Sequence, residues 1–116
     1  MKDYMMVADT IQKQLQGCTV TDANGTHKGF IAMMSWGATN FVGHEANDEG
    51  FGALCFQVKG RKFKGAVKIR LLWNDTYKVE FWRTRRPAIK MVHSTQDVYA
   101  FDLAQIIDNY VEGAAA

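Results

Sequence analysis

The sequence predicts an α+β fold: a two-layer sandwich in which an antiparallel sheet of four to five strands carries an N-terminal and a C-terminal helix on one face. Apolar residues recur at helical spacing near both ends of the chain, and they alternate with polar residues over several short segments of the second half. Two amphipathic helices and a sheet with one apolar face bury their apolar surfaces most simply by packing together. The length of 116 residues fits a single domain, residues 1–116.

The first predicted element is a helix over residues 4–16. Asp3 is available as its N-cap, and Gly17 is placed to end it. Apolar residues follow the spacing that places side chains on one side of a helix. This apolar face consists of Tyr4, Val7, Ala8, Ile11 and Leu15.

The next segment, up to residue 50, contains one predicted strand and a long loop. Asn24-Gly25 is a turn signal, and the apolar run Phe30–Met34 after it predicts a strand. Residues 35–50 hold three glycines and an acidic stretch, which is typical of a loop. Compact domains seldom contain so long a loop without structure of its own, so we expect either a functional loop or a further element near Asn40–Val42.

Three strands follow, each indicated by strict alternation of apolar and polar residues. Their inward residues are Leu54, Phe56 and Val58 in the first, Val67, Ile69, Leu71 and Trp73 in the second, and Tyr77, Val79 and Phe81 in the third. A fourth strand is expected at residues 88–93, after a turn at Arg85-Arg86-Pro87.

The chain closes with a predicted helix over residues 97–112. Ser94 and Asp97 approximate a capping box at its start, and Gly113 is placed to end it. Its apolar stripe consists of Tyr99, Leu103, Ile106, Ile107 and Tyr110.

The alternation also predicts how the second and third of these strands pair. A two-residue loop would turn Lys78 and Glu80 onto the apolar face, where both charges would be buried. A three-residue loop, Asn74-Asp75-Thr76, keeps that face apolar. It pairs Trp73 with Tyr77, Leu71 with Val79 and Ile69 with Phe81, and on the outer face it sets Arg70 opposite Glu80 and Lys68 opposite Trp82.

The basic residues gather in the middle of the chain. Residues 59–90 contain eleven Lys or Arg against two acidic residues, whereas residues 91–116 contain four acidic residues and no basic one. Such a one-sided patch attracts polyanions even though the formal net charge is only +2. An equally weighted alternative is that these charges only solvate an exposed sheet face and its turns.

Enzymatic and metal-binding classes have little support in the sequence. The three histidines are far apart and the two cysteines form no C-x-x-C pair, so we expect buried thiols, no metal site and no cofactor. His44 lies in the acidic stretch, for which a solvated loop is a better interpretation than a weak cation site. The loop Gly60–Gly65 lacks the Gly-Lys-Ser/Thr end of a nucleotide-binding P-loop. We therefore expect a protein that is not an enzyme.

The leading hypothesis is that a basic, Trp-containing sheet face binds nucleic acid, with a single strand as the form that suits it. Cations follow the phosphates, and aromatic faces stack on bases at about 1–3 kcal/mol each. The alternative for the aromatics is that Phe63 packs under its own loop and that Trp82 is covered by a neighbouring subunit or by the long loop. The candidate binding residues are Arg61, Lys62, Phe63, Lys64, Lys68, Arg70, Lys78, Trp82, Arg83, Arg85 and Arg86.

A second hypothesis is a protein-interaction module, such as an inhibitor that docks on a host protein with a basic nucleic-acid channel. It would use the acidic residues Glu45, Asp48, Glu49, Asp102, Asp108 and Glu112. A small enzyme is the third and least supported interpretation. A sheet of this size leaves edge strands, and pairing through an edge would give a homodimer.

The chain resembles a group of small, functionally unassigned proteins encoded by bacteriophages, plasmids and related mobile elements. The segments that carry the resemblance are Phe30–Met33, Gly37–Phe41, Asn74–Tyr77 with Glu80-Phe81, and Val98–Ala100 with Leu103. Members of that group tend to have Lys where this chain has Thr39, and a tighter turn than Met34–Gly37. The resemblance implies a phage or mobile-element setting, in which DNA handling and interference with host defences are common tasks, and it implies no catalytic residue.

The predicted location is the cytoplasm of a bacterial host. No apolar run approaches the ~18 residues that a membrane span requires, and the N-terminus has no signal-peptide run. We therefore expect a soluble protein without a membrane partner.

Overall fold

The computed structural model describes residues 4–22, 25–48, 50–84 and 89–112. The helices are α1 (Tyr4–Gly17), α2 (Gly29–Ser35) and α3 (Leu103–Val111), with a 3-10 turn η1 (Ala100–Asp102) before α3. The strands are β1 (Thr19–Asp22), β2 (Gly25–Lys28), β3 (Thr39–His44), β4 (Gly50–Lys59), β5 (Lys64–Leu72), β6 (Tyr77–Arg83) and β7 (Lys90–Val98). Predictions that fell on Asp3, Asn24, Glu49, Arg85, Arg86, Pro87, Ala88 and Gly113 lie outside the described residues.

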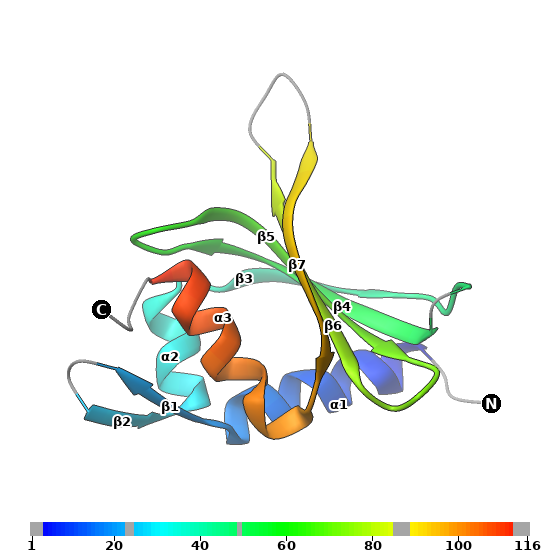
Figure 1. Cartoon of the computed structure of the whole chain (residues 1–116), viewed down its shortest axis with the longest axis horizontal. Helices are drawn as coiled ribbons and strands as arrows, with labels where there is room; N and C mark the ends of the chain where they lie inside the picture. The colour runs from blue at the N-terminus through cyan, green and yellow to red at the C-terminus, as the bar shows by residue number, and fades with distance from the viewer. Residues whose placement is uncertain (1–3, 23–24, 49, 85–88, 113–116) are drawn as a thin grey trace.

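The predicted α+β sandwich is confirmed. Strands β3 to β7 form one antiparallel sheet in the order β3-β4-β5-β6-β7, and β1 and β2 form a separate hairpin. All three helices lie on one side of the five-stranded sheet, and the β6–β7 hairpin rises from the other side (Figure 1). None of the helices in the described part of the chain is long and apolar enough to cross a membrane.

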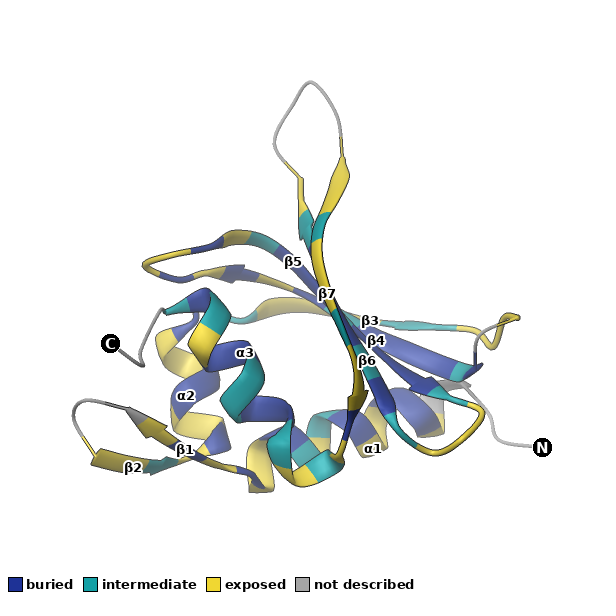
Figure 2. Ribbon diagram, in the orientation of Figure 1, coloured by how far each residue is buried: buried dark blue, intermediate teal, exposed yellow. Residues whose placement is uncertain are grey.

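The core lies between the helices and the inner face of the sheet. The inner face is the apolar face that the alternation predicted, since Phe56, Ile69, Val79 and Phe81 are all fully buried. Helix α1 supplies the opposite wall, as its four predicted apolar residues after Tyr4 are buried. The burial is continuous along the central strands, whereas the outer sides of α1 and α2 are exposed (Figure 2).

The predicted strand at residues 30–34 is wrong, because this segment is the helix α2. Gly29, Ala32, Met33 and Trp36 are buried and follow helical spacing, whereas Phe30 and Met34 between them are 50% and 76% exposed. A strand would have buried alternate residues. The apolar run therefore concealed a helical period whose most important member, Trp36, comes after the run.

Residues 39–44 form the further element that the long loop was expected to contain. They make the edge strand β3, which pairs with β4 through a bulge between Thr39 and Val42. Asn40 adopts a φ of 58° at this bulge, a conformation that asparagine tolerates better than most residues. The sheet therefore ends in the edges β3 and β7, and homodimerisation through an edge stays a prediction.

Four residues, Trp73–Thr76, connect β5 to β6, so the predicted three-residue loop is wrong and the predicted register differs by two positions. The Leu72 N–H donates to the Thr76 carbonyl at 2.9 Å across this turn. Asp75 takes the left-handed position of the turn with a φ of 65°. A shift of two preserves the faces. The pairs are Leu71 with Tyr77, Ile69 with Val79, Val67 with Phe81, Arg70 with Lys78, Lys68 with Glu80 and Ala66 with Trp82.

The C-terminal helix is shorter than predicted because β7 extends through residue 98. Ser94 and Asp97 belong to this strand, so the proposed capping box is wrong. Of the predicted stripe, Leu103 and Ile107 are fully buried, but Tyr99 precedes the helix and is exposed. Bulges in β7, with Asp97 at a φ of 58°, obscure the alternation that would have indicated the strand.

Candidate nucleic-acid interface

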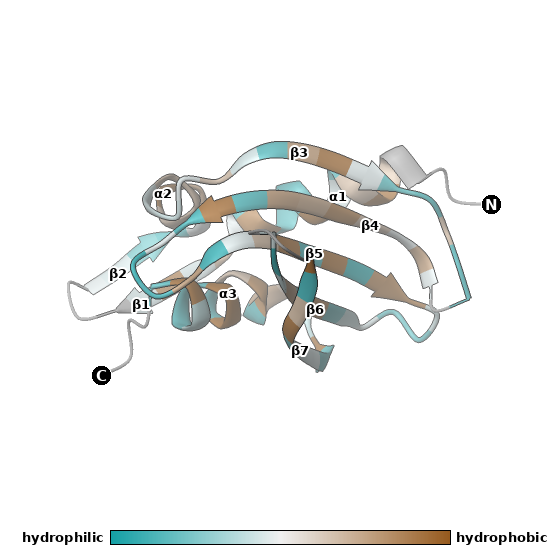
Figure 3. Cartoon of the chain, turned by 90° about the horizontal axis from the view of Figure 1, so that it is seen from above, coloured by the Kyte–Doolittle hydropathy of each residue, from teal (hydrophilic) through white to brown (hydrophobic). Residues whose placement is uncertain are grey.

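The outer face of the sheet, the side away from the helices, is seen from above in Figure 3, and the register places Lys68, Arg70, Lys78 and Trp82 on it. Register places side chains of neighbouring strands in rows across this face. One row contains His44, Ala53, Arg70 and Lys78, and the next contains Val42, Cys55, Lys68 and Glu80. The inward-outward prediction for Lys68, Arg70, Lys78 and Trp82 is therefore correct, although their cross-strand partners differ from those expected.

The outer face is not the open, solvated surface that the sequence predicted. Arg70 and Glu80 are buried at 6% and 5% exposure, and Lys68, Lys78 and Trp82 are partly buried. The β6–β7 hairpin rises from the sheet beside β5 (Figure 1), and Thr84 and Ile89 next to its strands help to line a pocket on the outer face.

Two adjoining pockets make this face concave. The smaller, of about 270 Å³, is lined by His44, Cys55, Ala66, Lys68, Trp82, Thr84 and Ile89. The larger, of about 610 Å³, is lined by Gln57, Val58, Lys59, Lys64, Gly65 and Thr84. Both include Thr84, so they form one depression along β4 and β5, which we call the basic groove. Its lining includes the small residues Cys55 and Ala66 and the cations Lys59, Lys64 and Lys68.

The groove has a strong excess of positive charge. The outward positions of β4, β5 and β6 carry five cations, and Glu80 is the one acidic residue in these three strands. The five cations are Lys59, Lys64, Lys68, Arg70 and Lys78. Glu80 is already engaged, because its carboxylate lies 3.3 Å from Lys78 Nζ and accepts the Trp82 indole N–H at 2.9 Å. Positive charges lining a low-dielectric cleft concentrate the field that attracts a polyanion.

Trp82 forms part of the wall of the smaller pocket. Lys68 Nζ lies 5.7 Å from the centre of its ring, a cation–π contact, and the indole N–H is held by Glu80. These two contacts fix the ring in place beside the pocket. A planar group that enters the pocket would meet an aromatic surface with a cation beside it, which is the arrangement that stacks a base and holds its phosphate.

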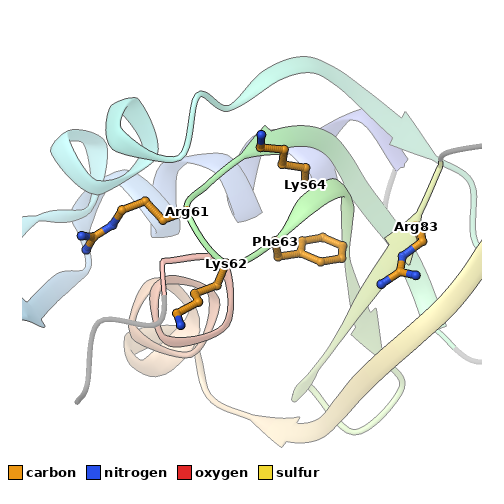
Figure 4. A pocket seen from close by; sticks show the side chains of 5 residues that line it. All are labelled: Arg61, Lys62, Phe63, Lys64 and Arg83. Carbon is orange, nitrogen blue, oxygen red and sulfur yellow. The ribbon is translucent and has the colours of Figure 1, made fainter.

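A third pocket, of about 360 Å³, lies at the end of the sheet beyond α3 and is lined by Arg61, Lys62, Phe63, Lys64 and Arg83 (Figure 4). Phe63 and Arg83 point toward one another, whereas Arg61 points away. Arg61 is held by Glu112, with its Nε 3.3 Å from the carboxylate. Lys64 belongs to both this pocket and the basic groove, so the two basic regions adjoin.

Phe63 cannot act as the stacking surface that the sequence suggested. Its side chain is 7% exposed and packs against Phe81 and Tyr110, with ring centres 5.7 and 5.2 Å apart. The alternative given above, a core residue under its own loop, is correct. Of the predicted set, the structure gathers Lys64, Lys68, Arg70, Lys78 and Trp82 on one face, and it leaves Arg61, Lys62 and Arg83 near the end of the sheet.

The basic loop is anchored on the C-terminal end of α3. The N–H groups of Lys62 and Phe63 both donate to the Val111 carbonyl, at 2.8 and 3.1 Å. Cations at the end of a helix that carries partial negative charge are also favourable. Gly60 permits this approach, since a Cβ on it would lie 2.1 Å from Val111 Cγ1.

Gly60→Ala is therefore expected to destabilise the protein by about 1–3 kcal/mol, the usual range for forcing an extra carbon into a packed site. Urea unfolding followed by circular dichroism measures the change. Gly17→Ala is the matched control, because a Cβ there would meet nothing within 4 Å. That variant should be neutral or slightly stabilised, through the lower entropy of its unfolded chain. Equal losses in both variants would contradict the close packing at Gly60.

Sequence reasoning missed His44, Gln57, Lys59 and Thr84 as part of this site. Lys59 could have been found, since it precedes the loop of the β4–β5 hairpin directly opposite Lys64. His44 could not, because β3 itself was not recognised. Burial, and then the charges of Lys68 and Arg70, lower the pKa of His44 below its ordinary value. His44 therefore enters the groove as a neutral hydrogen-bonding ring.

The described residues offer no poised catalytic group in the groove. Burial raises the pKa of the Cys55 thiol, so Cys55 stays protonated and is a poor nucleophile at neutral pH. In the part of the chain that the structure describes, no group of three or more His, Cys, Asp or Glu could hold a metal ion.

The structure changes the role available to two acidic residues of the second hypothesis. Asp108 is 2% exposed, and its Oδ1 accepts the Trp36 indole N–H at 2.9 Å inside the core, so it cannot contact a docking partner. Glu112 is engaged with Arg61. Glu45 and Asp48 are exposed on the β3–β4 connection, and Glu49 lies outside the described residues. A protein partner therefore stays a prediction.

No protein-family model, no curated protein sequence and no solved structure was found to match this chain.

Proposed function

We propose that this chain is a non-enzymatic protein that binds nucleic acid in the basic groove. The observation that carries the proposal is the concave outer face, where five cations of β4, β5 and β6 stand against a single carboxylate that is already engaged. Lys68 and Trp82 add a cation and a ring side by side. A phosphate chain with bases is the polyanion that uses both features. A phage or mobile-element origin remains an expectation of the sequence resemblance.

A single strand fits this groove better than a duplex. A duplex is recognised by elements that enter its grooves to contact base edges or that lie along its backbone. The Trp82 ring instead lines a depression. An unstacked base can enter a depression and lie against a ring. The smaller pocket, of about 270 Å³, is of a size for one base rather than a base pair.

Fluorescence anisotropy with a labelled single strand tests the proposal. Binding should be detectable at low ionic strength and weaken steeply with salt, with a slope of log K against log[salt] of about −0.7 for each phosphate contacted. Contact between a phosphate and each of the five cations of the outer face therefore predicts a slope of about −3.5. A duplex of the same length should bind more weakly. No binding to DNA or RNA strands at low salt would overturn the proposal.

A further inference from the structure

We propose that Arg70, together with Lys68 and His44, forms a subsite for one phosphate group at the inner end of the basic groove. This inference rests on the proposed function and deepens it, because it assigns the place where the backbone of the bound strand is anchored. The ligand class is a phosphate with at least one free pair of oxygens, as in a phosphodiester or in inorganic phosphate.

Arg70 is a buried arginine whose Nε has no hydrogen-bond acceptor among the described residues. Its side chain is 6% exposed, and the Nε itself has no accessible surface. Arginine stays protonated in proteins, so burial cannot be relieved by loss of the proton. A buried, uncompensated charge is strongly unfavourable, and native folds avoid it unless another group compensates it.

Among the described residues, no neighbouring side chain compensates the positive charge of Arg70. Across the strands, Arg70 lies opposite Ala53 on one side and Lys78 on the other. Glu80 is the nearest carboxylate in the sheet register, but its two oxygens are taken by Lys78 and by the Trp82 indole. No described residue forms an ion pair with Arg70 at 4.0 Å or less.

Two further donors lie on the same face beside Arg70. Lys68 precedes Arg70 by two residues on the same strand and face, and His44 lies in the same row beyond the short side chain of Ala53. Lys68 and His44 both line the smaller pocket, whose lining ends at these two neighbours of Arg70. The charges of Lys68 and Arg70 reach His44, since both depress its pKa after the larger effect of burial.

A phosphate is the ligand that fits these donors. The planar guanidinium of Arg70 presents parallel N–H groups to two oxygens of one anion, and Lys68 adds a point charge. His44 is neutral at pH 7, so it can donate one N–H to a third oxygen without adding a further charge to the cluster. An anion bound between Arg70, Lys68 and His44 would compensate the buried positive charge of Arg70.

Arg70→Met tests the subsite, with Lys28→Met as the matched control because Lys28 is an exposed cation of β2, outside both basic regions. Without added anion, Arg70→Met should melt at the same temperature as the wild type or higher, since an uncompensated charge is removed. Inorganic phosphate, added at constant ionic strength, should raise the melting temperature of the wild type and of Lys28→Met but not of Arg70→Met.

Oligonucleotide binding gives the second readout. Arg70→Met should bind a single strand about tenfold or more weakly, the effect of losing one charge-assisted contact, whereas Lys28→Met should lose about threefold at most. If the wild type binds the strand and Arg70→Met binds it equally well, the subsite is wrong and the proposed function stands. If no strand binds but phosphate stabilises the wild type through Arg70, the proposed function is wrong and the subsite stands. Equal phosphate shifts in all three proteins would overturn the subsite.

Discussion

Trp36→Ala should destabilise the protein by about 3–5 kcal/mol, the range for truncating a large buried aromatic residue. Trp36 is fully buried, stacks with Phe56 at a ring separation of 6.4 Å, and donates its indole N–H to Asp108. The substitution removes all of these contacts. It also takes the donor away from a buried carboxylate oxygen, which adds a desolvation penalty to the loss of packing.

Thermal and urea unfolding measure this effect, and the melting temperature should fall by about 10 °C or more for a chain of this length. Trp73→Ala is the control, since Trp73 is 53% exposed and its N–H donates to the Asp48 carbonyl at the surface. It should lose much less stability than Trp36→Ala. A similar loss for the two variants would contradict the placement of α2 and of Trp36 in the core.

The faces of the central sheet could be predicted from the sequence because strand alternation has a period of two. That period assigns each of the residues from Val67 to Leu71 and from Tyr77 to Phe81 to a face, whatever the exact pairing. An error of two positions in register therefore left the inner and outer faces unchanged. The pairing itself depends on which residue accepts a left-handed φ, and Asp75 was not distinguished from its neighbours by pattern alone.

The elements that were wrong have weak or interrupted patterns. Helix α2 has seven residues, so its helical period is defined mainly by Ala32, Met33 and the following Trp36. Strand β7 is an edge strand with bulges, and most of its side chains are exposed. In both cases tertiary packing decides the structure, because neither segment carries enough local signal to do so.

The candidate site was only partly predictable for a different reason. The sequence placed Lys68, Arg70 and Trp82 on one face, but it could not show that the face is concave. The concavity depends on how β6–β7 rises from the sheet, which is a property of the whole fold (Figure 1). The burial of Arg70, on which the phosphate subsite depends, likewise has no counterpart in residue spacing.

The largest expected effect on binding comes from reversing charge in the groove. Lys64→Glu together with Lys68→Glu removes two cations, one beside each pocket, and adds two negative charges next to the path of the strand. We expect the affinity for a single strand to fall about 100-fold or more at low salt, since each lost charge contact accounts for about tenfold. The salt slope should become shallower by about 1.4, which is two contacts of about 0.7 each.

The matched control is Lys13→Glu with Lys28→Glu, which changes the net charge by the same amount. These lysines are exposed on α1 and β2, on the helical side of the sheet and away from the groove (Figure 1). If binding is an effect of overall charge alone, the two double variants will lose affinity equally, and the groove is then not the site. If binding follows the outer face, the control will lose only a few-fold through the long-range field, and it will keep the wild-type salt slope because it has lost no phosphate contact.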